Sequence, residues 1–237
     1  GINLFFDFIL NYNILKITIN SVLLVLLVVC LATLISLPLA FLNVRTNLPF
    51  AKYLISISVL PIALPSYVMA TTQIELWGPR GIAYDILNKF FGTGHLPSFY
   101  GLSGSVIVLT LITYPYIYIG LCATFRRFDF QMIDASRTLG ASVPKTFSKI
   151  IFPLVMPTVA SGSLLVSLYV LSDFGAVALL RFNTFTIAIF NRMYSSIGNY
   201  GVLEICSIAI LFCFFILFIE SRTRSNSRYF SNSNSAN

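Results

Sequence analysis

Five long apolar runs in the sequence are each close to the length that a membrane-spanning helix requires. About 20 consecutive apolar residues are needed for a helix to cross about 30 Å of hydrocarbon. The runs are Thr18–Leu42, Tyr53–Ile74, Ser105–Phe125, Ile150–Leu171 and Val202–Ile219. Backbone in lipid must satisfy its own hydrogen bonds, and these runs are too long and continuous for barrel strands. The sequence therefore predicts an all-α fold, a polytopic transmembrane helix bundle of about five spans.

Composition supports a membrane protein and argues against a nucleic-acid-binding protein. The chain is 57% hydrophobic and 10% charged, whereas soluble domains average about 45–50% and about 25%. Its formal net charge of +7 would suit nucleic acid only if the basic residues formed a continuous surface. They lie instead between the apolar runs, so we expect no nucleic-acid partner.

The orientation follows from the distribution of Lys and Arg, which are in excess in cytoplasmic loops. With five spans, ten basic residues fall on one side and five on the other. The ten are Arg45, Lys52, Arg126, Arg127, Arg137, Lys145, Lys149, Arg222, Arg224 and Arg228, and the five are Lys16, Arg80, Lys89, Arg181 and Arg192. We therefore expect the first side in the cytoplasm, with the start of the chain outside and its end inside. An outside start without a signal sequence suggests that at least one more span precedes Gly1.

Five prolines fall in the second, third and fourth runs, where each removes a backbone donor and should kink or interrupt its helix. They are Pro61, Pro65, Pro115, Pro153 and Pro157. Two interpretations remain open: ordinary tolerance of proline in membrane helices, or bent helices that line a cavity.

Three further segments lie outside the runs. Residues 3–19 could form a helix on the membrane surface, and Phe174–Asn199 is expected to be interfacial or re-entrant. The chain is therefore divided into a transmembrane domain, residues 1–220, and a polar tail, residues 221–237, that is expected to be a disordered end or a linker.

The longest cytoplasmic segment, residues 126–149, carries apolar side chains that a solvated connector would not need. Asp134–Gly140 is typical of a short helix ended by a left-handed glycine, and Ser142 with Pro144 then predicts the start of a second helix. Two short helices with exposed apolar side chains suit a groove on another protein. The alternative is an amphipathic loop lying on the bilayer.

The same segment resembles a family motif. Asp134-Ala135-Ser136, Gly140 six residues after Asp134, and Ile151-Phe152-Pro153 are similar to the "EAA, then G, then I-x-LP" loop of binding-protein-dependent ABC importer permeases. In that family the loop forms coupling helices that dock on the cytoplasmic ATPase. The sequence departs from the motif in Asp134, Ser136 and Phe152. The resemblance implies ATPase-coupling roles for Asp134, Ala135, Ser136, Leu139, Gly140, Ala141 and Pro153.

Four other stretches resemble ferric-iron permeases of this superfamily, specifically their first half, with thiamine permeases as near relatives. The stretches are Leu60–Tyr67, Thr113–Tyr116, Arg137–Ala141 and Ser172–Ala178. Those permeases usually fuse two halves through a polar basic linker, and Glu220–Asn237 lies where such a linker would begin. The chain is therefore expected to pair with a second permease half, or alternatively to form a homodimer.

The sequence contains no GxxxxGK[ST] phosphate loop, so we expect no cofactor in this chain. ATP and Mg²⁺ would be bound by a cytoplasmic ABC ATPase dimer, and a periplasmic substrate-binding protein would supply specificity. Neither catalytic residues nor a resident metal site are predicted.

For ferric iron, a hard cation, oxygen ligands would suit the pathway. The candidates are Tyr67, Tyr114, Asp173 and Glu204. The two acids could instead be ordinary interfacial charges at helix ends. The two tyrosines could instead belong to the aromatic belt at the membrane interface.

The function predicted is therefore that of a non-enzymatic permease subunit in the bacterial inner membrane, most simply for ferric iron, with thiamine or another small solute as the alternative. A secondary transporter or channel is the rival from a different class. Carriers of that class place ionisable residues at mid-membrane, and the predicted spans contain almost none.

Overall fold

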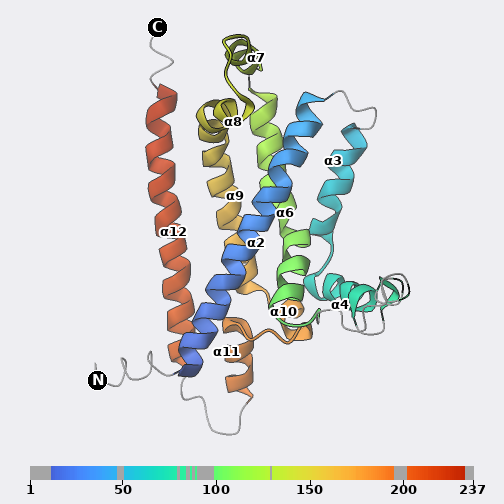
Figure 1. Ribbon diagram of the computed structural model, residues 1–237. Helices are drawn as coiled ribbons and strands as arrows, with labels where there is room; N and C mark the ends of the chain where they lie inside the picture. The colour runs from blue at the N-terminus through green and yellow to red at the C-terminus, as the bar shows by residue number, and fades with distance from the viewer. Residues whose placement is uncertain are drawn as a thin grey trace.

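The computed structural model describes residues 12–46, 51–78, 81–83, 86, 89, 99–128, 130–194 and 202–232, and these ranges contain helices and turns but no β-strand. The all-α prediction is confirmed. The helices are α2 (Tyr12–Arg45), α3 (Ala51–Val59), α4 (Ser66–Trp77), α6 (Leu102–Arg126), α7 (Gln131–Thr138), α8 (Val143–Thr146), α9 (Phe152–Ser172), α10 (Gly175–Leu179), α11 (Phe185–Met193) and α12 (Val202–Asn232), as labelled in Figure 1.

Three helices among the described residues are long and apolar enough to cross a membrane: Ile14–Arg45, Leu102–Arg126 and Val143–Ser172. The second of these, α6, lies at the centre of the bundle, and Val108, Leu109, Ile117 and Leu121 are fully buried on it. The helix α12 contributes a shorter apolar stretch, Val202–Phe218. The five runs thus appear as three long spans, one broken pair and one shorter apolar helix.

The second run, Tyr53–Ile74, is the broken pair. The chain passes from α3 through a 3-10 turn, Leu60–Ala63, into α4, and the two arms are bent by 105°. Leu64 is extended, with φ −89° and ψ 127°, as the residue before a proline tends to be. Pro61 and Pro65 therefore interrupt this run as expected, whereas Pro115 and Pro157 lie inside unbroken helices.

Small residues bring α6 and α9 close together. A Cβ added to Gly162 would lie 2.9 Å from Ile117 Cγ1 and 3.0 Å from Ile117 Cα. Nearby, the hydroxyls of Thr124 and Thr158 are 2.7 Å apart and form a hydrogen bond between the two helices. Small residues and hydroxyl pairs of this kind stabilise helix packing in a membrane, where lipid is as apolar as leucine.

Two hydrogen bonds join α2 to α6 inside the bundle. The Ser36 hydroxyl donates to the carbonyl oxygen of Tyr114 at 2.8 Å, and the Asn43 amide donates to the Tyr118 hydroxyl at 2.6 Å. Ser36, Asn43 and Tyr118 are all buried. Because a buried polar group without a partner is costly, these pairs fix the register of α2 on α6.

The structure describes parts of the three segments that lie outside the apolar runs. Residues 12–19 belong to α2, with Ile14 and Ile17 buried, so the surface-helix prediction is wrong for them; residues 3–11 lie outside the described part. The segment expected to be interfacial contains α10 and α11, which lie together at one end of the bundle (Figure 1). The backbone of α12 is helical to Asn232, because the helix propagates from the apolar turns before it. The division at residue 220 into a transmembrane domain and a tail or linker stays a prediction.

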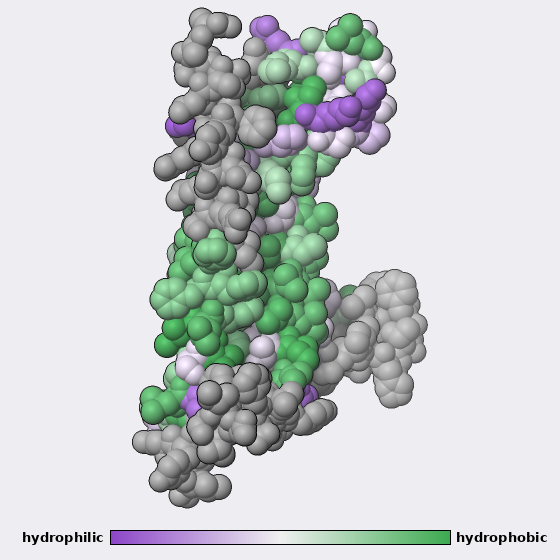
Figure 2. All heavy atoms as spheres, turned by 90° about the vertical axis from the view of Figure 1, so that its left-hand side faces the viewer, coloured by the Kyte–Doolittle hydropathy of each residue, from purple (hydrophilic) through white to green (hydrophobic). Residues whose placement is uncertain are grey.

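The opposite end carries α7, α8 and the last residues of α2 and α6 (Figure 1). We call it the basic end, after Arg45, Arg126, Arg127, Arg137, Lys145 and Lys149. Figure 2 shows hydrophobic side chains along the middle of the bundle and hydrophilic ones toward its ends, as expected for a protein whose middle lies in lipid.

Candidate functional site

The segment of residues 126–149, which we call the coupling loop, contains two short helices, of which α7 is the first. The end of α7 is a Schellman motif: the Ala141 N–H donates to the Ser136 carbonyl and the Gly140 N–H to the Arg137 carbonyl, both at 3.0 Å. Gly140 has φ +82°, a conformation that side-chain-bearing residues rarely adopt. The predicted helix stop at this glycine is confirmed.

The second short helix, α8, starts where Ser142 and Pro144 predict it. Ser142 stands at the N-cap position with an extended backbone, although its side chain makes no capping hydrogen bond, and Pro144 lies in the first turn. From Thr146 the chain continues through a π-helical turn, Phe147–Ile151, directly into α9, whose first turn contains Pro153. No loop therefore separates α8 from α9.

Ser136 holds the two short helices together. Its hydroxyl donates to the Ile133 carbonyl at 2.8 Å and lies 3.1 Å from the hydroxyl of Thr146, which is buried. The resembled motif has alanine where this chain has Ser136, so the departure adds a contact between α7 and α8 that alanine could not make.

Asp134 connects the coupling loop to α2. Its Oδ1 accepts a hydrogen bond from Arg45 Nη2 at 2.8 Å. The Arg45 guanidinium also lies over the rings of Phe41 and Phe130, at 5.8 and 5.5 Å from their centroids, which adds a cation–π attraction. The arginine thus joins the end of α2 to α7 by charge and by stacking.

The outer surface of the coupling loop is apolar in places. Leu139 is 87% exposed, and Met132 and Val143 are more than half exposed. Ala135 is exposed and Ala141 half-buried. The contribution of these residues to ATPase coupling stays a prediction, while their exposure leaves an apolar surface available to a partner.

The four pathway candidates do not form one cluster. Tyr67 is exposed on α4, Tyr114 is half-buried in α6, and Glu204 is exposed in the first turn of α12. Asp173 is only 8% exposed at the end of α9. Their role in transport stays a prediction.

Asp173 has a structural environment of its own. Its Oδ2 accepts a hydrogen bond from the Ala176 N–H at 3.0 Å, and the Ser66 side chain from the start of α4 is a second partner. Burial raises the pKa of the Asp173 carboxyl above 3.8, against these hydrogen bonds, which lower it. The carboxyl therefore ties the broken second run to α10.

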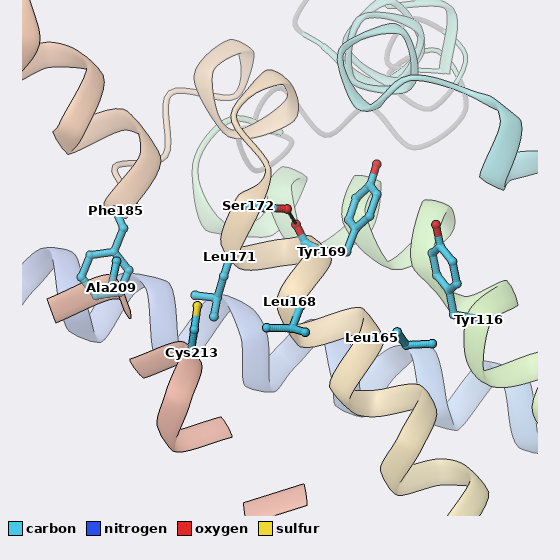
Figure 3. Close-up of a pocket in the computed structure, with 9 residues that line it drawn as sticks. All are labelled: Tyr116, Leu165, Leu168, Tyr169, Leu171, Ser172, Phe185, Ala209 and Cys213. Carbon is cyan, nitrogen blue, oxygen red and sulfur yellow. Dashed lines mark hydrogen bonds between the residues drawn. The ribbon is translucent and has the colours of Figure 1, made fainter. Parts of the chain in front are cut away.

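A cavity of about 560 Å³ lies between α6, α9, α11 and α12 (Figure 3). Most of its lining is apolar, and two tyrosines on neighbouring helices, Tyr116 and Tyr169, have ring centroids 6.2 Å apart. Figure 3 shows their hydroxyls pointing in the same direction, away from Ala209 and Cys213 of α12. Sequence reasoning missed Tyr169 as a site residue, because nothing local distinguishes it from other aromatic residues of a span.

The helix bundle and its basic end define a multi-pass membrane protein, and comparison with known proteins gives its family. Residues 3–222 match the family described as "Binding-protein-dependent transport system inner membrane component". The chain belongs to this family and is an inner-membrane permease of the binding-protein-dependent ABC importer type. The secondary-transporter and channel alternatives are thereby set aside.

Relatives in the family differ in substrate. The chain is 30% identical to the Fe(3+)-transport system permease protein FbpB 2 of Haemophilus influenzae over 68% of its own length and 28% of that protein. It is 29% identical to the molybdenum transport system permease protein ModB of Escherichia coli K12, over 85% of this chain and 91% of ModB. It is also 28% identical to the probable sulfate transport system permease protein cysT of Prototheca wickerhamii, over 52% of this chain and 47% of that protein.

Solved structures support the fold. The chain is similar to two inward-facing structures of the MetNI methionine ABC transporter, with TM-scores of 0.64 and 0.67 at 14% and 12% identity. The matches cover 90% and 91% of this chain and 94% and 96% of the matched chains.

Proposed function

We propose that the coupling loop docks on a cytoplasmic ATPase and transmits its movement to the bundle. The observation that carries this proposal is the unbroken path from α8 through the π-helical turn into α9. Because Asp134 binds Arg45 at the end of α2, a force on the loop acts on two spans at once. The exposed Leu139, Met132 and Val143 supply the apolar contact that such docking requires.

In this proposal the partner ATPase dimer binds ATP and Mg²⁺, and this chain contributes no covalent chemistry. Closure of the ATPases displaces the coupling loop and shifts the bundle between inward-facing and outward-facing states. A periplasmic substrate-binding protein delivers the solute, and a second permease half, or a second copy of this chain, completes the pathway.

The substrate proposed is ferric iron. The similarity to a ferric permease supports it, as does the suitability of tyrosine and carboxylate oxygens for a hard cation. A molybdate-type oxyanion is the second candidate, because the similarity to ModB extends over nearly all of that protein. Tyrosine hydroxyls such as those of Tyr116 and Tyr169 could donate hydrogen bonds to an oxyanion instead.

The test is reconstitution of the chain in liposomes with its ATPase and its binding protein, followed by measurement of ATP-dependent uptake of ⁵⁵Fe(III) and of ⁹⁹Mo-molybdate. Uptake of iron alone supports the proposal, and uptake of molybdate alone replaces iron with the oxyanion. The loop variant Gly140→Val provides a control that should abolish either uptake.

The same reconstitution distinguishes the two assemblies. ATP-driven uptake without any second permease half would indicate a homodimer. Uptake that appears only after a second half is added would indicate a heterodimeric arrangement.

A further inference from the structure

A second cavity, of about 360 Å³, lies at the basic end between α2, α7 and α8. Most of its lining is apolar, including Leu37, Phe41, Phe147 and Ile151. Arg45 at the end of α2 and Arg137 on α7 also line it, and we call the part that they form the rim. Leu37 and Arg45 are eight residues apart on α2, which places them about 12 Å apart along the helix axis. The cavity is therefore amphipathic along its length, apolar inside the span and cationic at the end.

The charge at the rim is positive. Asp134 pairs with Arg45 through one carboxylate oxygen, and in the described part of the chain no carboxylate lies within 4 Å of the Arg137 guanidinium. A guanidinium has five N–H donors, so both arginines have donors left for an anion. Arginine is well suited to phosphate because its planar fork matches the oxygen geometry.

The position of the cavity indicates which kind of molecule carries that anion. Its apolar lining comes from two spans, Ile14–Arg45 and Val143–Ser172. A soluble acidic peptide or free phosphate would have no reason to fill such a lining. A phospholipid supplies both halves, an acyl chain for the inner part and a phosphate for the rim. Basic pockets at the cytoplasmic ends of membrane helices bind anionic lipid headgroups for this reason.

We propose that this cavity binds one anionic phospholipid of the leaflet at the basic end, with its phosphate at Arg137 and Arg45 and an acyl chain between α2 and the π-helical turn. The lipid lies against α7, α8 and the residues that join them to α2. Its binding therefore stabilises the coupling loop in the arrangement seen in the structure.

The proposal is tested by photo-crosslinking in native nanodiscs prepared from cells that express the full chain. The probe is phosphatidylglycerol with a diazirine on the acyl chain, and crosslinked residues are mapped by mass spectrometry. Labelling should be enriched at residues 37–41 and 147–151 over residues 211–215 of α12, where Leu211, Phe214 and Phe215 are exposed. Equal labelling of the three stretches overturns the proposal.

Variants separate the cationic rim from the apolar interior. Arg137→Glu should lower the enrichment about fivefold, while Arg127→Glu, an exposed basic residue of the same end that does not line the cavity, should leave it unchanged. Leu37→Trp should lower it by filling the cavity with all charges intact. Unchanged labelling in both Arg137→Glu and Leu37→Trp counts against the site.

Competition experiments distinguish binding of an anionic lipid from binding of free phosphate. Unlabelled phosphatidylglycerol should displace the probe, and a phosphatidylcholine probe with the same diazirine should show no enrichment. If inorganic phosphate displaces the probe completely, the site belongs to a soluble phosphate, and the lipid proposal is wrong.

Discussion

Arg45 Nη2 and Asp134 Oδ1 lie 2.8 Å apart and join α2, which runs the length of the bundle, to the first helix of the coupling loop. The two residues are 89 positions apart in the sequence. Side chains of both are partly exposed, at 30% for Arg45 and 63% for Asp134, and pairs of this kind contribute only about 0.2–1 kcal/mol to stability. The pair therefore contributes little to the free energy of unfolding, and the role proposed for it is to link the coupling loop to α2.

The first prediction concerns this ion pair. Asp134→Arg and Arg45→Asp should each reduce ATP-dependent uptake by the complete transporter about fivefold, since about 1 kcal/mol of lost preference shifts a two-state equilibrium by that factor. The double variant Arg45→Asp/Asp134→Arg should recover most of the loss. Uptake and melting temperature are measured together, and the melting temperature should change little.

Lys16→Glu, a change at an exposed basic residue of α2 outside the coupling loop, is the control and should transport normally. If both single variants are impaired and the charge swap rescues neither, Asp134 acts on a partner protein and not on Arg45.

The second prediction concerns the turn between α7 and α8. No atom lies within 4 Å of a Cβ added to Gly140, so Gly140→Val acts only through its positive φ, at a cost of about 1–2 kcal/mol. Membrane insertion should stay normal, while uptake and association with the ATPase are lost. Gly140→Asn is the control, because asparagine tolerates the left-handed conformation, and it should keep most of the activity. Loss of activity in both variants would show that side-chain volume at the docking surface, and not backbone conformation, is what matters.

The coupling loop shows which parts of the site are predictable from sequence. The helix stop at Gly140 and the helix start after Ser142 depend on local backbone chemistry, so a few residues suffice to predict them. The pairing of Arg45 with Asp134 depends on how α2 packs on α6, and no local pattern reports that packing. The sequence alone identifies Arg45 only as one more positive charge at the end of a span.

The broken second run shows the same limit for the fold. Pro61 and Pro65 predict an interruption, because each removes a backbone donor. The 105° angle between its arms reflects contacts made by α4 with α10, including Ser66 beside Asp173. Those contacts join segments more than 100 residues apart, so the sequence predicts that the run breaks but not where its second arm goes.

The third prediction concerns the contact of α6 with α9. Gly162→Ala should destabilise the bundle by about 1–3 kcal/mol, because its Cβ would meet the backbone Cα of Ile117 at 3.0 Å. Gly120→Ala is the matched control: its Cβ would meet only Thr158 Cγ2, at 2.9 Å, and that side chain can shift. Thermal unfolding in detergent measures both. Equal melting temperatures for the two variants would contradict a rigid crossing at Gly162.

The fourth prediction follows from the buried carboxyl of Asp173, which lies just beyond the span Val143–Ser172. Burial raises its pKa in the folded state above 3.8, so the folded protein binds this proton more tightly than the unfolded chain does. The associated stabilisation is present at low pH and is lost as the pH rises through the raised pKa. Asp173→Asn should remove this loss and flatten the pH dependence of the melting temperature, measured from about pH 4 to 7.

A steeper decline of the melting temperature in Asp173→Asn would show that its hydrogen bonds to Ala176 and Ser66 dominate over burial.

The last prediction tests the orientation of the bundle, on which both the ATPase contact and the lipid site depend. The observation behind it is that ten of the 15 Lys and Arg residues fall at one end, which the positive-inside rule places in the cytoplasm. Single cysteines are introduced at Ser142 in the coupling loop and at Asn191 in α11, both of which are exposed, in a background where Cys30, Cys122, Cys206 and Cys213 are replaced by alanine. In intact spheroplasts a membrane-impermeant maleimide should label Ser142→Cys only after permeabilisation and Asn191→Cys without it. Labelling of both cysteines from the outside would contradict the arrangement in which α7 and α8 lie at the opposite end of the bundle from α11. Labelling of Ser142→Cys alone from the outside would show that the orientation is reversed, and the coupling loop would then be out of reach of a cytoplasmic ATPase.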